Sequence, residues 1–62
     1  MKVNGREMDL DRIRILELLD RLELDSSRLV VEVNGQIIQK DQYDLLLKRG
    51  DRIELVSFVG GG

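Results

Sequence analysis

Residues 52–62 read Arg-Ile-Glu-Leu-Val-Ser-Phe-Val-Gly-Gly-Gly, a strand-like run that passes directly into a glycine tail. Because glycine has no Cβ, a tail of Gly60, Gly61 and Gly62 is slender and free in φ and ψ. Fully extended, such a tail reaches about 10 Å beyond the fold. At its tip we expect the α-carboxylate of Gly62, a group that no side chain obstructs. A glycine end is also typical of a linker or of a frayed terminus, so the tail alone leaves both interpretations open.

The composition limits the class of protein. The 62 residues make one domain near the lower size limit for folding without disulfides or metals. The sequence contains no Cys and no His, which removes disulfides, thiolate metal sites and the usual general base. Its 10 basic and 12 acidic residues are interspersed, which argues against a nucleic-acid-binding face. No apolar run is long enough to span a membrane, and Met1-Lys2-Val3 does not resemble a signal peptide. We therefore expect a cytoplasmic protein that binds no metal, nucleic acid or membrane.

Two Asn-Gly pairs, at residues 4–5 and 34–35, each separate two short segments of strand-like composition. Asn-Gly is the strongest short-range signal for a two-residue type I′ hairpin, because both central residues of that turn need a positive φ. The sequence therefore predicts two β-hairpins. The strands expected on either side of these turns are residues 1–3, 6–10, 28–33 and 36–38.

Between the two hairpins, residues 11–22 show helical periodicity. The positions that fit an amphipathic helix are Ile15, Leu16, Leu18, Leu19 and Leu22. We expect Asp11 or Asp9 to cap the N-terminus of this helix, where a carboxylate is favoured by the helix dipole.

The remaining segments complete the predicted topology. Residues 40–48 fit either a short helical turn or an irregular packing segment, and 49–51 form a turn into a final strand over 52–59. A final strand that pairs in parallel with the very short first strand, at the centre of the sheet, gives the β-grasp arrangement. The predicted fold class is α+β, with a mixed four- to five-stranded sheet and one helix packed across one face. The expected domain covers residues 1–59, and 60–62 form a flexible tail.

With these elements placed, the chain resembles the ThiS family of ubiquitin-like sulfur carriers over essentially its whole length. The Gly-Asp turn, the final strand and the terminal glycines at their mutual spacing are the most specific part of the resemblance. The chain departs from the family at Arg14, where Thr or Ser is usual at the helix start. It departs again at Glu23, where Gly is usual after the helix, and near Gln39, where Pro is usual. The stretches that carry the resemblance are Val3-Asn4-Gly5, Leu16-Glu17-Leu18-Leu19, Val31-Glu32-Val33-Asn34-Gly35, Ile37-Ile38, Tyr43, Gly50-Asp51-Arg52-Ile53-Glu54-Leu55-Val56 and Phe58-Val59-Gly60-Gly61-Gly62.

The resemblance implies a function in which the chain is a protein co-substrate and not an enzyme. It implies that an adenylyltransferase of the ubiquitin-activating type (ThiF type) uses ATP to adenylate the Gly62 carboxylate. The adenylate is then converted to a thiocarboxylate with sulfur from a cysteine-derived persulfide. A thiazole synthase (ThiG type) uses that sulfur to build the thiazole of thiamine. The resemblance implies no catalytic residue and no bound cofactor on the carrier, since ATP is consumed by the activating partner.

A partner-binding surface follows from the alternation along the final strand. If Ile53 and Leu55 face the helix, then Val56 and Phe58 lie on the uncovered face of the sheet, and Val30 can join them. We hypothesise that Val56, Phe58 and Val30 form the surface that the activating enzyme recognises. The alternative interpretation is that these side chains pack under residues 40–48.

Two other functions remain open at this stage. One is a sulfur carrier of the MoaD type, which serves molybdopterin synthesis, and the other is a β-grasp interaction module with an inert tail.

Acidic pairs such as Asp51 with Glu54 are expected to be surface turn residues and not acid–base groups. Tyr43 is expected to be a half-buried ring with its hydroxyl group in solvent.

Overall fold

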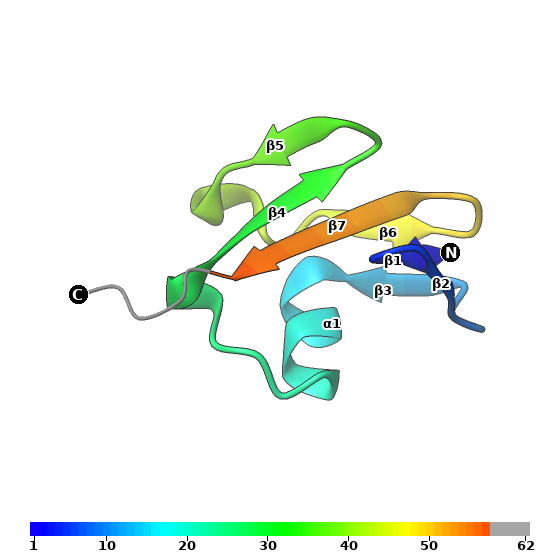
Figure 1. Ribbon diagram of the computed structural model, residues 1–62, viewed down its shortest axis with the longest axis horizontal. Helices are drawn as coiled ribbons and strands as arrows, with labels where there is room; N and C mark the ends of the chain where they lie inside the picture. The colour runs from blue at the N-terminus through cyan, green and yellow to red at the C-terminus, as the bar shows by residue number, and fades with distance from the viewer. Residues whose placement is uncertain (58–62) are drawn as a thin grey trace.

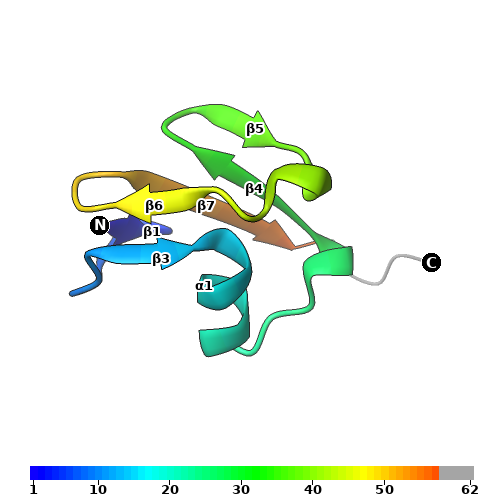
Figure 2. The ribbon, with the colours of Figure 1, turned by 180° about the vertical axis from the view of Figure 1, so that it is seen from behind.

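The computed structural model describes residues 1–57, which form two layers. Five strands make one mixed sheet in the order β2-β1-β7-β4-β5. Helix α1 and a small two-stranded sheet lie on one side of it, as Figures 1 and 2 show from opposite directions. Phe58 and the predicted tail of Gly60, Gly61 and Gly62 lie outside the described residues. The elements are β1 (Lys2–Val3), β2 (Arg6–Glu7), β3 (Arg12–Arg14), α1 (Ile15–Arg21), the 3₁₀ turn Ser26–Arg28, β4 (Leu29–Val33), β5 (Gln36–Ile38), the 3₁₀ turn Lys40–Gln42, β6 (Leu46–Lys48) and β7 (Arg52–Ser57).

Strand β7 occupies the centre of the five-stranded sheet. It pairs in parallel with β1, where Val3 lies opposite Ile53, and antiparallel with β4, where Val31 lies opposite Leu55. The central, parallel pairing of the first and last strands confirms the predicted β-grasp fold. The predicted range of four to five strands is also confirmed.

Both Asn-Gly pairs form the predicted hairpin turns. Asn4 and Gly5 have φ values of 52° and 78°, and Asn34 and Gly35 have values of 52° and 86°. The strands that they join are antiparallel, with Val3 opposite Arg6 in the first hairpin and Val33 opposite Gln36 in the second. The first return strand is shorter than expected, since β2 contains only Arg6–Glu7 of the predicted residues 6–10.

The helix is shorter than the expected range of 11–22, and its cap was wrongly assigned. Arg14 has an extended backbone with φ −78° and ψ 154°, so α1 begins at Ile15. The backbone N–H of Arg14 donates to Oε1 of Glu17 at 3.0 Å, which is half of a capping box. Asp9 and Asp11 therefore do not cap the helix, and Oδ1 of Asp11 instead lies 3.6 Å from Nε of Arg49.

Strand β3 takes the residues that were predicted as the first turn of the helix. Arg12, Ile13 and Arg14 alternate between polar and apolar, and only Ile13 among them is buried. The segment pairs antiparallel with β6, where Ile13 lies opposite Leu47. The interpretation of residues 40–48 as a helical turn or irregular segment was thus wrong for 46–48, because a partner strand was available to them.

The end of α1 is a Schellman motif with an unusual residue. The N–H of Glu23 donates to the carbonyl of Asp20 at 3.0 Å, and the N–H of Leu24 donates to that of Leu19 at 2.9 Å. The motif places Glu23 in the left-handed region, with φ 57°. Glycine is the residue that takes this conformation without strain, so Glu23 carries a local conformational cost.

The core lies between the five-stranded sheet and the layer of α1, β3 and β6. Tyr43 is only 4% exposed, so its ring is more buried than the expected half-buried position. Burial raises the pKa of Tyr43 above its usual value. Leu16 was expected on the apolar face of the helix but is 52% exposed. The buried apolar residues of the described part are Met1, Val3, Ile13, Ile15, Leu18, Leu19, Leu29, Val31, Val33, Tyr43, Leu47, Ile53 and Leu55.

Candidate functional site

The open face of the five-stranded sheet carries two of the three predicted partner-binding residues side by side. Val30 on β4 lies directly opposite Val56 on β7. Val56 is 50% exposed and Val30 is half-buried, whereas Ile53 and Leu55 are buried against the other layer, as expected. Figure 1 looks onto this face, with β7 in front of β6. Phe58, the third predicted residue, lies outside the described residues.

Residues 40–48 do not cover this face. Tyr43 and Leu47 belong to the core cluster, and β6 pairs with β3 on the helix side of the sheet. In Figure 2, which is turned by 180°, β6 and α1 lie in front of β7. The alternative interpretation, in which this segment packs over Val56 and Val30, is therefore wrong for these two residues.

Strand β7, which leads toward the glycines, is held at its edges by the two hairpin asparagines. The backbone N–H of Leu55 donates to Oδ1 of Asn4 at 2.7 Å, and that of Arg52 donates to Oδ1 of Asn34 at 2.9 Å. The Asn34 amide also donates to Oδ1 of Asp51 at 3.1 Å. The Asn4 and Asn34 side chains continue the hydrogen-bond ladder at the positions where β1 and β4 end in turns. Strand β7 is therefore hydrogen-bonded along much of its length.

Asp51 is a turn residue, as expected, and not part of an acid–base pair. Its Oδ2 accepts a hydrogen bond from the backbone N–H of Lys48 at 2.9 Å, across the turn before β7. Glu54 lies on β7, where it alternates with the buried Ile53 and Leu55. The Asp51 carboxylate is thus committed to holding the turn.

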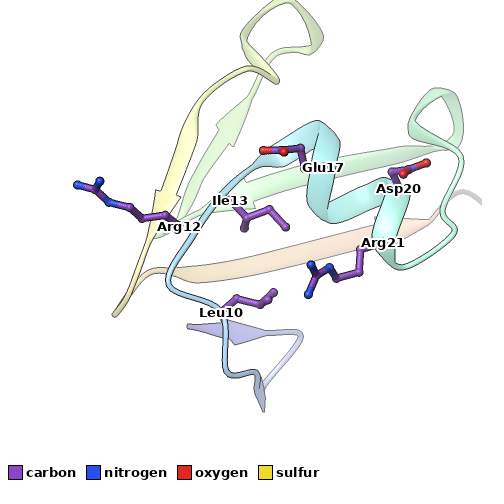
Figure 3. A pocket seen from close by; sticks show the side chains of 6 residues that line it. All are labelled: Leu10, Arg12, Ile13, Glu17, Asp20 and Arg21. Atoms are coloured by element: carbon purple, nitrogen blue, oxygen red, sulfur yellow. The ribbon is translucent and has the colours of Figure 1, made fainter.

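An open groove of about 440 Å³ lies beside α1. Figure 3 shows Arg12 and Asp20 pointing away from each other, while Glu17 is engaged in capping the helix. A small-molecule site needs a few convergent polar groups, and this groove lacks them. Its lining residues are Leu10, Arg12, Ile13, Glu17, Asp20 and Arg21.

The described residues 1–57 hold no group of three or more side chains suited to bind a metal ion. Within the same residues, no helix is long and apolar enough to cross a membrane. What the described part offers is therefore a surface and a strand that leads to the chain's final glycines.

Comparison with known proteins gives consistent matches along the chain. A profile of the ThiS family matches residues 1–62. The sulfur carrier protein ThiS of Bacillus subtilis is 37% identical over 65 residues, covering 100% of this chain and 98% of the relative. A thiazole synthase of Paramagnetospirillum magneticum is 37% identical over 62 residues, but this chain spans only 19% of its length.

The fold comparison agrees with the sequence comparison. The crystal structure of a thiamine biosynthesis protein (ThiS) from Geobacter metallireducens superimposes with a TM-score of 0.80 at 32% identity. The match covers 98% of this chain and 96% of that one. Among the functions that the sequence left open, the matches favour the ThiS-type carrier over the MoaD-type carrier and over an interaction module with an inert tail. The ThiS profile spans residues 1–62, and the Bacillus subtilis protein and the Geobacter metallireducens structure match over nearly their whole lengths, so this chain belongs to the ThiS family.

Proposed function

We propose that the carboxylate of Gly62 is the reactive group of this protein and that an adenylyltransferase of the ThiF type activates it with ATP. The chain is a ThiS-family sulfur carrier of thiamine biosynthesis, and it acts as a co-substrate and not as an enzyme. In the proposal no cofactor is bound to the carrier, and ATP is consumed by the activating partner. The observation that carries the proposal is the family match over residues 1–62, which includes the glycine end.

The chemistry places few demands on the carrier. A free carboxylate is a poor electrophile, whereas a mixed anhydride with AMP contains a good leaving group. A cysteine-derived persulfide then attacks the adenylate and displaces AMP, which gives an acyl disulfide on Gly62. A thiol of the partner enzymes reduces the S–S bond of this intermediate, which leaves the thiocarboxylate on Gly62 and a disulfide on the partners. Nucleophiles and bases for these steps belong to the partners, so the lack of Cys and His in this sequence is compatible with the proposal. Gly60 and Gly61 serve as a thin tether that fits a narrow active-site channel.

A thiazole synthase of the ThiG type is the proposed acceptor of the sulfur. The relative from Paramagnetospirillum magneticum is named thiazole synthase, and a segment similar to this chain makes up 19% of it. The presence of both in one polypeptide supports a functional association between this kind of carrier and that enzyme. The proposed location is the cytoplasm, with no nucleic acid or membrane as partner.

Val56 and Val30, together with Phe58, are proposed to form the apolar contact with the activating enzyme. Val56 lies on the strand that leads to Gly62, six positions before it, so an enzyme that holds the tail lies within about 20 Å of this face. An exposed apolar side chain in the centre of a sheet face is a common feature of protein interfaces.

A reaction with purified partners tests the proposal. The chain is incubated with ATP and a ThiF-type adenylyltransferase from the same genome, and carrier-dependent exchange of pyrophosphate into ATP is measured. Addition of a persulfide donor and a thiol reductant should then replace one oxygen by sulfur in the intact mass of the chain. Appending an alanine after Gly62 should abolish both signals. If the unaltered chain supports neither, the proposal is wrong.

A surface variant tests the contact separately. Val56→Asp should raise the KM for the carrier, because a charge enters an apolar contact, while the unfolding free energy changes little at an exposed position. Leu24→Asp is the matched control, since Leu24 is exposed next to the helix end. If the two variants have equal effects on KM, Val56 has no place in the interface.

A further inference from the structure

The register of the sheet sorts the open face into rows of different chemistry. Lys2 lies opposite Arg52, Glu32 lies opposite Glu54, and Val30 lies opposite Val56. Because alternate residues of a strand share a face, Arg52, Glu54 and Val56 follow one another along β7 on the open side. The open face therefore carries three rows in order along β7. They are a basic row (Lys2 and Arg52), an acidic row (Glu32 and Glu54) and an apolar row (Val30 and Val56).

The acidic row is an unfavourable arrangement in the isolated carrier. Residues directly opposite each other on neighbouring strands have Cβ atoms about 5 Å apart, and like charges at that position repel. Of the ion pairs in residues 1–57, none involves Glu32 or Glu54; they join Met1 to Glu7, Asp25 to Arg28 and Asp11 to Arg49. Glu54 is exposed and Glu32 is half-buried, so both are accessible from the open face.

A cationic side chain placed between the two carboxylates would relieve this repulsion. Arginine fits best, since its planar guanidinium group can donate to two carboxylates at once. The neighbouring rows restrict the orientation of the incoming surface. Apolar groups must meet Val30 and Val56, and a basic group displaced toward Arg52 would be repelled. A surface with one apolar row and one cation beside it therefore fits in only one register.

We propose that Glu32 and Glu54 together bind an arginine or lysine of the activating enzyme and fix the register in which that enzyme docks on the sheet. This inference rests on the proposed function and goes beyond its apolar contact. Continuity along β7 favours the activating enzyme as the occupant. Glu54 of the acidic row lies two positions before Val56 on β7, the strand that precedes the glycine tail in the sequence. Attraction between opposite charges also accelerates a repeated, transient encounter such as carrier activation.

The test uses steady-state adenylation with charge-neutral variants of the full chain. Glu32→Gln, Glu54→Gln and the double variant remove charge with little change of shape, and Asp20→Asn on α1 removes one charge from the helix layer as a control. The double variant should raise the KM for the carrier about tenfold at low salt with kcat unchanged. Its KM should also depend less steeply on salt concentration than that of the unaltered chain. Asp20→Asn should change neither quantity.

Thermal unfolding separates binding from folding. The double variant should melt at the same temperature as the unaltered chain or at a higher one, because a repulsive pair has been removed, so a raised KM cannot come from misfolding. If KM and its salt dependence match those of the unaltered chain, the acidic row is not part of the interface. If adenylation is unchanged but capture by the thiazole synthase is lost, the assignment to the activating enzyme is wrong. If the unaltered chain is not adenylated at all, the proposed function itself fails.

Discussion

The side-chain oxygen of Asn4 accepts a hydrogen bond from the backbone N–H of Leu55 at 2.7 Å, although 51 positions separate the two residues. Strand β1 ends at Val3, so this side chain provides the acceptor that a longer strand would have supplied from its backbone. The same asparagine forms the turn, with φ 52°. One residue therefore shapes the first hairpin and ties it to the central strand.

Replacing Asn4 should separate these two contributions. Asn4→Ala loses the hydrogen bond and replaces asparagine, which tolerates the left-handed region, by a residue that does not, for a loss of about 2 kcal/mol in the free energy of unfolding. Asn4→Gly keeps the turn conformation and loses only the hydrogen bond, for a loss of about 1 kcal/mol. Urea denaturation of both variants measures the difference. Equal losses would show that the positive φ carries no cost at this position.

Glu23→Gly should stabilise the protein. Glu23 is the left-handed residue of the Schellman motif, and glycine takes that conformation without a clash between Cβ and the backbone. We expect a gain of about 1 kcal/mol, which corresponds to a rise of about 4–8 °C in the melting temperature of a domain this small. Calorimetry measures this rise, with Glu23→Ala as the control that retains the Cβ and should gain little.

Glu17 should be required at the start of α1 for its side-chain acceptor and not for its charge. Its Oε1 accepts the N–H of Arg14, so Glu17→Ala should lose about 1 kcal/mol of unfolding free energy. Glu17→Gln retains an acceptor oxygen at the same place and should lose much less. A loss for Gln as large as that for Ala in urea denaturation would assign the effect to charge.

Asp25 should contribute to acid sensitivity. Hydrogen bonds from the Ser27 hydroxyl and backbone N–H lower the pKa of Asp25 below its ordinary value of 3.8, and the positive charges of Arg28 and Lys40 lower it further. A carboxylate with a lowered pKa in the folded state stabilises that state above the unfolded pKa. This stabilisation is lost as the pH falls below about 3.8 toward the folded pKa.

Asp25→Asn tests this contribution. The variant should be less stable than the unaltered chain at pH 6, and the difference should shrink as the pH is lowered below 3.8. Urea denaturation at a series of pH values gives the comparison, and a chemical-shift titration of the Asp25 carboxyl group gives its pKa directly. A stability difference that stays constant down to the folded pKa would refute the linkage.

The sequence predicts those parts of the fold whose signals are local. Each Asn-Gly turn combines two residues that favour positive φ, and the alternation of Ile53 and Leu55 with Glu54 and Val56 defines the two faces of β7. From these two patterns follow both hairpins and the open position of Val56 and Val30. The solved ThiS structure, which superimposes with a TM-score of 0.80, agrees with this fold.

The elements that were missed depend on contacts between distant segments. Residues 12–14 continue the periodicity of α1 poorly, but three residues are too few to distinguish a strand from a helix end by pattern alone. Residues 12–14 form a strand because they pair with β6, which lies more than thirty positions later in the sequence. The pattern of β6 is itself ambiguous, since its apolar pair Leu46-Leu47 also fits a helix. Likewise, only the register of β4 on β7 reveals that Glu32 faces Glu54. The alternation places each of them on the open face but does not pair them.

The position of β7 also has a consequence for how the chain is made. The strand that joins β1 to β4 is the last of the described strands to leave the ribosome, so the sheet cannot form until Ser57 has been synthesised. A chain that stops before Arg52 keeps two hairpins with unpaired edges, which invite proteolysis and aggregation. Premature termination before β7 should therefore yield products that are degraded, because only a chain that contains β7 can complete the five-stranded sheet.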